Sequence, residues 1–382
     1  MNLKILHLLS NWKWTEISEP VVELALAQKR LGAEIEFVCG RDPVKGSKFG
    51  VEYHARLKGL GSIHALDMPK HLNVLSLFKD FFVLRPLLKR FKPDVIHCHK
   101  RNALMMGLFI RGMSKLPVIV YSSYDPEGPS QGKRMRLLFT LGTDGMVVIS
   151  EKSRRLVVSK NGFSADVVQV AEPGIDLERF SPRRKISEQI GRFGLDPDAF
   201  VVGVVTRIRE SRRLDIVLKA LHTLAPSHSH LQILLVGRGR EGAVESVVEK
   251  PAQEMGIFDK VFMPGYCDGD RLVAAYRAMD VLVYPIPGSD KTCRTVREAM
   301  ASGVPVIAPR IGFLPELIDD RITGRLMNSS RESLVQILRE LMQDKTRLRE
   351  MGRRSLETAI QRFSPKLQAE KTFTFYDRIL KR

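Results

Sequence analysis

Two acidic side chains flank a cluster of basic and small polar residues in the second half of the chain. Asp290 and Glu298 are separated by seven residues, the first five of which are Lys291, Thr292, Cys293, Arg294 and Thr295. A helix is predicted to begin near Thr292, and the free N–H groups at a helix start suit phosphate. Carboxylates accept hydrogen bonds from hydroxyl groups. These residue types fit an anionic, hydroxyl-bearing ligand, although a surface salt bridge would also explain Glu298.

A second basic segment is Gly203–Asp215, G-V-V-T-R-I-R-E-S-R-R-L-D, which contains Arg207 and Arg212. A guanidinium can bridge two phosphate oxygens, so either arginine could hold a phosphate. The alternative is that the basic residues of this segment form a solvated loop without a ligand.

The elements that carry these residues are predicted to be short buried strands alternating with helices. This pattern is typical of parallel sheets with crossover helices. The strands expected in the first half are Lys4–Leu9, Ala33–Cys39, Pro93–His97, Val118–Tyr121, Gly145–Ile149 and Val167–Val170. Those expected in the second half are Val201–Thr206, Leu231–Val236, Lys260–Pro264, Val281–Pro285 and Pro305–Ala308.

The fold class is therefore α/β, with two Rossmann-like doubly wound domains. The expected domains are 1–175 and 176–362, and we expect 363–382 to be a C-terminal helix that crosses back to the first domain. Ligands of open parallel sheets bind beyond the carboxyl ends of the strands. Two such sheets facing across a cleft favour a two-substrate transferase or a closing binding protein.

The composition has a strong excess of basic residues. No apolar segment is long enough to predict a membrane span. The 382 residues include 61 Lys+Arg and 43 Asp+Glu, a net charge of +18. Such an excess indicates an anionic partner, but it is spread over both halves and accompanies no nucleic-acid motif, so we expect no nucleic-acid partner. Four cysteines without a C-x-x-C pair indicate free thiols in the cytoplasm. No His, Asp or Glu spacing predicts a metal site.

Several segments together resemble one enzyme family. Pro285–Ala308 contains an acid, seven residues, then Glu-Ala-Met-Ala, glycine and Pro-Val-Ile; Pro93–His99, Val170–Phe180, Leu235–Gly239 and Gly312–Glu316 follow the same family's order. In this the chain resembles the retaining family-4 glycosyltransferases of the GT-B fold. The chain departs from the family in having Asp290 for the usual Glu and Lys-Thr-Cys for the usual Gly-Phe-Gly.

The resemblance implies a role for each donor-side residue. Arg207 and Arg212 would hold the diphosphate of a nucleotide sugar, Asp290 would lie beside the sugar, and Glu298 would bind the ribose. The remaining implied donor contacts are Lys291, Thr292, Cys293, Arg294, Thr295, Gly237 and Tyr266. The donor would be a UDP- or GDP-sugar, and neither a cofactor nor a metal would be needed.

Fewer residues in the sequence indicate where an acceptor would bind. The loop after the first strand carries Trp12 and Trp14, whose indole faces suit a sugar or lipid but could equally pack against the protein. Where many relatives have a histidine after the strand Val118–Tyr121, this chain has Ser123 nearby and no histidine. His99 is a further acceptor-side candidate, with a packed, hydrogen-bonded histidine as the alternative.

Residues Pro69–Lys92 mix leucine and phenylalanine with lysine and arginine. A basic amphipathic helix of this kind can lie on an anionic membrane, although an ordinary core-facing helix explains it too. We therefore expect a cytoplasmic enzyme, with attachment to the inner face of the cytoplasmic membrane left open.

The expected function is metal-independent, retaining transfer of a sugar to a glycan or lipid-linked acceptor, in bacterial surface polysaccharide or lipopolysaccharide assembly. The alternatives are a nucleotide-sugar epimerase of the same fold and a nucleotide-sugar-binding protein without activity.

Overall fold

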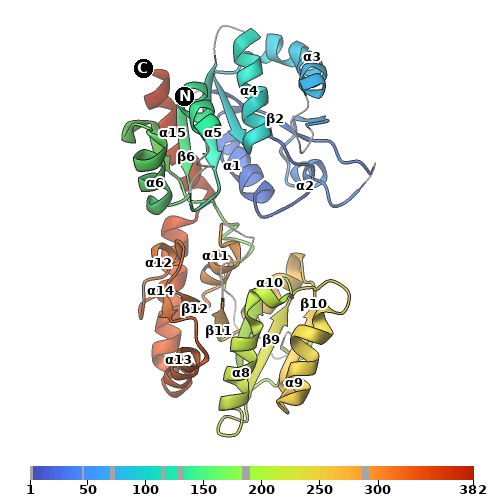
Figure 1. Cartoon of the computed structure of the whole chain (residues 1–382), viewed down its shortest axis with the longest axis vertical. Helices are drawn as coiled ribbons and strands as arrows, with labels where there is room; N and C mark the ends of the chain where they lie inside the picture. Colours follow the sequence, from blue (N-terminus) through green and yellow to red (C-terminus); the bar gives the residue numbers. More distant parts are fainter. Residues whose placement is uncertain are drawn as a thin grey trace. The chain divides into compact units, whose positions relative to one another are not determined.

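The structure is a computed structural model that describes residues 3–44, 47–68, 74–113, 117–127, 133–182, 190–285 and 292–382. The chain forms two units of similar size (Figure 1). Unit 1 comprises Met1–Gly174 together with Ser364–Arg382, and unit 2 comprises Ile175–Phe363. In the part of the chain that is described, no helix is both long and apolar enough to cross a membrane.

Unit 1 is built on a seven-stranded parallel sheet in the order β3-β2-β1-β4-β5-β6-β7. Its strands are β1 (Lys4–Leu9), β2 (Glu34–Gly40), β3 (Ile63–Leu66), β4 (Val95–His99), β5 (Val118–Ser123), β6 (Gly145–Val148) and β7 (Val168–Val170). Five residues of β1 in succession are buried. Such a continuous buried run is expected where helices cover both faces of a parallel sheet.

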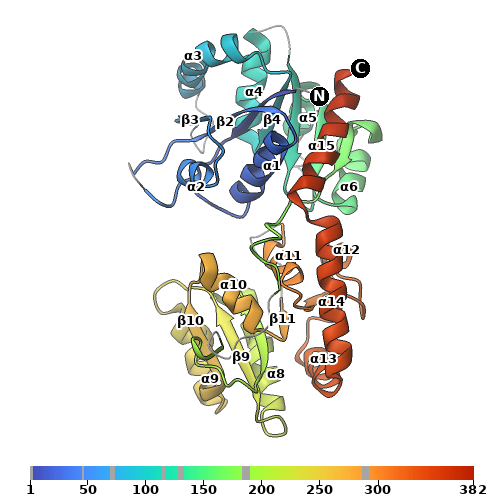
Figure 2. The same ribbon diagram turned by 180° about the vertical axis from the view of Figure 1, so that it is seen from behind.

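The helices of unit 1 include one from the far end of the chain. They are α1 (Ser18–Arg30), α2 (Val51–Leu57), α3 (Val74–Phe91), α4 (Arg101–Met113), α5 (Lys133–Gly142), α6 (Glu151–Asn161), the short 3₁₀ turn η1 (Ala165–Val167) and α15 (Pro365–Leu380). Figure 2 shows α15 lying beside α1. Leu24 and Ala27 of α1 form one buried cluster with Ala369 of α15, so the two ends of the chain pack against each other within unit 1.

Unit 2 has a six-stranded parallel sheet in the order β10-β9-β8-β11-β12-β13. Its strands are β8 (Phe200–Val205), β9 (Leu231–Val236), β10 (Val261–Gly265), β11 (Val281–Val283), β12 (Val306–Pro309) and β13 (Gly324–Met327). All the strands expected from the sequence are present in the two sheets, with ends shifted by one or two residues. The additional strands β3 and β13 are only four residues long.

The helical segments of unit 2 vary widely in length. They are η2 (Glu210–Arg212), α8 (Leu214–Leu224), the π-helical η3 (Glu245–Glu249), α9 (Lys250–Glu254), η4 (Phe258–Lys260), α10 (Gly269–Ala278), α11 (Arg294–Ala301), α12 (Leu314–Leu317), α13 (Arg331–Gln343) and α14 (Lys345–Arg362). In α8, Leu214, Val217, Leu218 and Leu221 are buried at the spacing of one helix face. Ser330 begins α13 by accepting a 3.2 Å hydrogen bond from the backbone N–H of Ser333.

Each sheet has one point at which the strand order reverses direction. In unit 1, β2 lies on one side of β1 and β4 on the other; in unit 2, β9 and β11 flank β8 in the same way. The crossovers on either side of such a point leave on opposite faces, which opens a crevice beyond the carboxyl ends of the two central strands. These two switch points are where ligands of this architecture bind.

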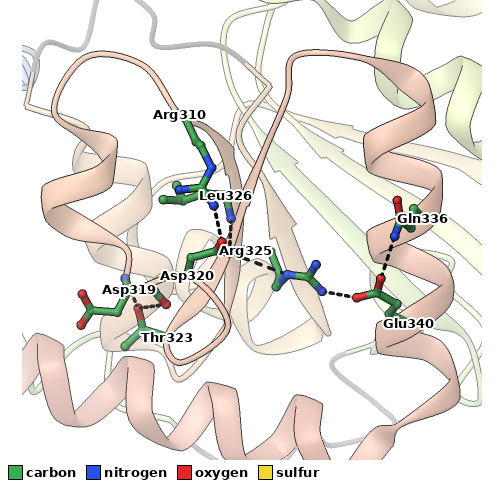
Figure 3. A network of polar contacts seen from close by, with 8 residues as sticks. All are labelled: Arg310, Asp319, Asp320, Thr323, Arg325, Leu326, Gln336 and Glu340. Atoms are coloured by element: carbon green, nitrogen blue, oxygen red, sulfur yellow. Dashed lines mark hydrogen bonds and ion pairs between the residues drawn. The ribbon is translucent and has the colours of Figure 1, made fainter.

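A network of charged side chains connects β12 and β13 to α13 (Figure 3). Asp320 accepts hydrogen bonds from the Arg310 guanidinium and from the Leu326 backbone N–H, the latter at 2.9 Å. Arg325, whose side chain is 8% exposed, lies 3.8 Å from Asp320 and also bonds to Glu340 of α13. This hydrogen bond lowers the pKa of Glu340.

We predict that Arg325→Met lowers the free energy of unfolding by about 1–3 kcal/mol. The variant keeps the length of the buried stem but leaves two carboxylates without their shared cation, and both are partly exposed, which limits the cost. Urea unfolding measures the effect. Arg331→Met is the control, because among the described residues Arg331 pairs with its neighbour Glu332 alone, at the surface, and the change should alter stability by less than about 0.5 kcal/mol. Equal effects of the two variants would contradict a structural role for the network.

Candidate functional site

The switch point of unit 2 brings basic residues to the end of β8. Arg207 lies two residues beyond the end of the strand and is exposed, and no described residue hydrogen-bonds or ion-pairs with its side chain. Arg212, in η2, is only 7% exposed. Arg213 adopts a left-handed backbone (φ 52°) and pairs with Asp215 at the start of α8, at 3.2 Å. Of these three arginines, Arg207 is the one whose charge is open to a ligand.

The loops after β8, β9 and β10 continue the sheet beyond the strands. The backbone N–H of Thr206 donates to Val236, that of Ile208 to Arg238, and that of Gly237 to Gly265, each at 3.0 Å. This ladder requires glycine at position 237, where φ is +154° and an added Cβ would lie 1.7 Å from the Thr206 carbonyl oxygen. Gly237 therefore determines how closely the loop after β9 approaches the loop that carries Arg207.

An exposed aromatic ring lies at the same end of the sheet. Tyr266 follows β10 and is 58% exposed. The guanidinium of Arg238 lies 5.1 Å from the centre of its ring, within the range of a cation–π contact. A large exposed ring backed by a cation offers a flat surface to a planar ligand.

Glu298 is part of a buried polar cluster in α11, which follows β11 on the other side of the switch point. The carboxylate is 3% exposed. One oxygen accepts from Arg294 Nε at 2.6 Å and the other from the Tyr276 hydroxyl at 2.7 Å. Burial and the neighbouring carboxylate raise the pKa of Tyr276 well above its ordinary value, so this hydroxyl remains a donor. The sequence suggested separate ligand contacts for Arg294 and Glu298, whereas the structure pairs them with each other.

The residues before α11 are held in place from inside the unit. Thr292 and Cys293 are 1% and 2% exposed. Arg297, itself 1% exposed, donates to the Thr292 carbonyl oxygen from Nε and Nη2 at 3.2 and 3.0 Å. Thr295 is half-buried. Sequence reasoning missed Arg297 and Tyr276, because nothing in their spacing distinguishes them from surface residues.

Cys293 has a left-handed backbone conformation, with φ 47° and ψ 45°. This conformation is costly for any residue with a Cβ. The backbone here therefore has glycine-like geometry at one of the positions where the resembled family has glycine. Asp290 and Lys291, the other two residues predicted for this loop, lie outside the described residues.

On unit 1, the tryptophan loop follows β1 at the switch point. The backbone N–H of Trp14 donates to the Phe49 carbonyl oxygen at 2.9 Å, and the Trp12 carbonyl oxygen accepts from Val51 at 2.7 Å. The Trp14 ring stacks on His54 of α2, with ring centres 4.5 Å apart. Both indoles are half-buried, so each leaves part of its surface open while the loop is fixed to the start of α2.

The other two acceptor-side candidates are buried. His99, at the end of β4, is 0% exposed, and Ser123, at the end of β5, is 3% exposed. His99 bonds to His7 of β1 at 3.0 Å and to the Tyr124 hydroxyl at 3.0 Å. This burial favours the packed histidine over one that faces an acceptor.

Among the described residues, one group has the geometry to hold a metal ion. It consists of His7, His97 and His99, whose possible ligand atoms lie within 4.8 Å of one another. No spacing in the sequence predicted it, because the three side chains come from two neighbouring strands. All six of their ring nitrogens already have a hydrogen-bond partner, as described below.

The fold defines a class: proteins with two Rossmann-like units, each built on a parallel sheet with one switch point, which is the GT-B architecture. Residues 20–179 match the model for Glycosyltransferase Family 4, and residues 185–358 match that for Glycosyl transferases group 1. The chain belongs to these glycosyltransferase families.

Individual relatives have low sequence identity with this chain. A D-inositol 3-phosphate glycosyltransferase of Nocardia farcinica is 32% identical over 289 residues, 70% of this chain and 62% of that protein. The chain spans between 55% and 62% of the length of the first such relatives.

Solved structures share the fold across nearly the whole chain. A glycosyltransferase from Rickettsia africae has a TM-score of 0.84 at 17% identity and covers 100% of both chains. Anabaena Alr3699/HepE in complex with UDP has a TM-score of 0.77 at 20% identity, covering 97% of this chain and 99% of that one.

We predict that Gly237→Ala lowers the free energy of unfolding of unit 2 by about 3 kcal/mol or more, because the new methyl group would overlap a backbone carbonyl oxygen. Gly242→Ala is the matched control. Gly242 also has a positive φ, +70°, but has no atom within 4 Å of its added Cβ, so only the backbone strain of about 1 kcal/mol remains. Thermal or urea unfolding of both variants measures the difference, and similar losses would refute the close approach.

Proposed function

We propose that this protein is a retaining, metal-independent glycosyltransferase that transfers a sugar from a UDP- or GDP-sugar to a glycan or lipid-linked acceptor. Unit 2 binds the donor and unit 1 the acceptor. The setting that we propose is the assembly of a bacterial surface polysaccharide or lipopolysaccharide.

The observation that carries the proposal is the exposed Arg207 at the switch point of unit 2, whose side chain has no partner among the residues that the structure describes. A guanidinium at the carboxyl end of the central strand is placed to bind a diphosphate. Across the switch point, α11 begins beyond β11 with its first N–H groups and the Arg294 side chain, which is 20% exposed. The charge on the diphosphate grows as the sugar bond breaks, so fixed cations stabilise the transition state more than the bound donor.

The other donor groups follow from the same end of the sheet. Tyr266, over which Arg238 lies, supplies a flat surface for the base. Each Glu298 oxygen has one bond within the protein and a second lone pair with which it could accept from a ribose hydroxyl. We propose that Asp290 contacts the transferred sugar and that Lys291 adds charge beside the phosphates.

The relatives support this class of donor. Anabaena Alr3699/HepE is seen with UDP and with UDP-glucose, and a lipopolysaccharide outer core galactosyltransferase, WaaB, has the same fold. Diphosphate binding by guanidinium groups leaves no step that calls for a metal. We propose that the leaving phosphate takes the proton of the acceptor hydroxyl, because neither His99 nor Ser123 is exposed to serve as a base.

A nucleotide-sugar-binding protein without transfer activity is the second candidate. It is favoured by the same burial of His99 and Ser123 on the acceptor side. Donor binding without turnover against any acceptor would support it.

We also propose that unit 1 attaches to an anionic membrane through α3. Apolar side chains on the exposed face of its first half are Leu75, Phe78, Phe82 and Val83, which are 80%, 44%, 57% and 57% exposed. The second half exposes Arg85, Lys89 and Arg90. Apolar groups that can enter the interface, next to cations that can contact lipid phosphates, are typical of interfacial helices.

For the donor site, we predict that Arg207→Gln weakens UDP- or GDP-sugar binding about 10- to 100-fold, the cost of losing a charged hydrogen bond. Isothermal titration with each donor measures it. Arg213→Gln makes the same change in charge in the same loop, at a residue engaged with Asp215, and should leave donor affinity within about twofold. EDTA should not reduce turnover. If neither donor binds, or if the two variants behave alike, the proposed donor site is wrong.

For the membrane face, we predict that Phe82→Ser lowers binding to vesicles of phosphatidylglycerol and phosphatidylcholine about fivefold, because a half-exposed ring no longer enters the interface. Cosedimentation measures the bound fraction. The control is Phe258→Ser in unit 2, where the ring is 41% exposed on another surface. Equal binding by the two variants, or no binding by the unmodified protein, would contradict attachment through α3.

A further inference from the structure

Three histidines that the proposed reaction does not use lie side by side inside unit 1. His7 of β1 is opposite His97 of β4 in the sheet register, and His99 is two residues further along β4. All three are 0% exposed. The residues that hydrogen-bond to their rings come from α1, from β5 with the residue after it, and from α15: Gln28, Ser122, Tyr124 and Tyr376. A buried imidazole must satisfy both nitrogens, so each of these contacts restricts the position of a proton.

The Gln28 amide sets the direction of the first half of this chain of hydrogen bonds. Its Oε1 can only accept, so His7 Nε2, at 2.8 Å, carries the proton that it donates. His7 is neutral and its Nδ1 is therefore an acceptor, so His99 Nε2, at 3.0 Å, donates to it. His99 Nδ1 is then an acceptor in turn, and the Tyr124 hydroxyl donates to it at 3.0 Å.

The nitrogen of the same Gln28 amide begins the second half of this chain of hydrogen bonds. Gln28 Nε2 donates to the Thr372 hydroxyl at 2.9 Å and to the Tyr376 hydroxyl at 3.2 Å. His97 Nδ1 lies 2.6 Å from the Tyr376 hydroxyl, and either atom can be the donor. In the ring proposed below, Tyr376 donates to this Nδ1 and the neutral His97 donates from Nε2 to Ser122 Oγ, at 2.7 Å.

The two halves come together at β5 and the residue just after it, which carry Ser122 and Tyr124. Tyr124 donates its proton to His99, so in a bond between the two hydroxyls Ser122 must be the donor. We propose that these side chains form one closed ring of hydrogen bonds, all running in the same direction, which fixes a proton on Nε2 of each histidine and fastens α15 to the sheet. The order of the ring is Tyr124, His99, His7, Gln28, Tyr376, His97, Ser122 and back to Tyr124.

The ring requires neutral imidazoles, and its surroundings keep them neutral. Burial lowers the pKa of His7 to about 4 and those of His97 and His99 well below the ordinary value. The groups that face them from α1, β5 and α15 are an amide and hydroxyls, none of them charged at neutral pH. A proton added to one imidazole would leave two hydrogen-bond donors facing each other. The bonds of the ring could then no longer all run in one direction.

A metal ion bound by the three histidines would require a different proton arrangement. The nitrogens of His7 and His99 that face each other are Nδ1 and Nε2. To bind a metal both must be deprotonated, which moves the His99 proton to Nδ1, towards Tyr124. The position of a single proton on His99 therefore distinguishes the ring from a metal centre.

The first experiment reads the three protons directly. Long-range ¹H–¹⁵N correlation spectra of the full-length, histidine-labelled protein at pH 7, assigned with His7→Asn, His97→Asn and His99→Asn, should show three neutral rings with the proton on Nε2. A proton on Nδ1 of any of the three would overturn the ring as assigned, as would a charged ring. A stoichiometric amount of zinc in the purified protein would overturn it in favour of the metal centre.

The second experiment tests whether the ring fastens α15. Tyr376→Phe removes one hydroxyl, leaves the aromatic ring in the core and deprives His97 Nδ1 of its donor. Backbone amides of α15 should then exchange with solvent about tenfold faster, the usual effect of one unsatisfied buried group. The matched control is Tyr121→Phe, because Tyr121 is a buried tyrosine of β5 outside the ring. Exchange in α15 that is equal in the two variants would overturn the fastening role. Neither experiment depends on glycosyl transfer.

Discussion

The burial of both sheets on both faces determines where chemistry can occur in this protein. A polar group inside such a sheet costs free energy unless it has partners, so most strand residues are apolar. Ligand-binding side chains are confined to the points where strands end. Arg207 lies at the end of β8, Tyr266 beyond β10 and the tryptophan loop beyond β1. The parallel direction of the strands brings these ends to one edge of each sheet, which is why residues distant in sequence form a site.

The proposed donor site contains both exposed charges and buried charges that already have partners. Arg207 is exposed, whereas Glu298 is buried and its cost is offset by Arg294 and Tyr276. A buried carboxylate with two fixed donors cannot reorient, and this rigidity keeps its remaining lone pairs aimed in one direction. Arg297 has the same role for the backbone, because it holds the Thr292 carbonyl from within the unit. In the proposed site, the residues that would contact a donor and the residues that hold them in place are thus different.

The sequence predicts what depends on local pattern and misses what depends on contact across the fold. Strands such as β1 and β9 are mostly apolar and could be located within a residue or two, whereas β3 and β13 are too short to produce a pattern. Arg207 could be recognised because its segment as a whole resembles a family motif. The pairing of Gln28 with Tyr376 could not, because 348 residues separate them in the chain. The left-handed Cys293 also escapes prediction, because cysteine rarely adopts that conformation.

His7, His97 and His99 of unit 1 are polar residues inside a sheet whose buried residues are mostly apolar, and their position has a physical explanation. An apolar residue at His97 would pack against α15 in several rotations of the helix, because hydrophobic contact has little directional preference. A hydroxyl of Tyr376 that must reach both Gln28 and His97 allows only one rotation and one register of α15. The segment that needs this constraint is the one that returns to unit 1 at Ser364, after the whole of unit 2 has been completed. Directional bonds at this place thus provide what the hydrophobic core alone does not: a single position for the last helix.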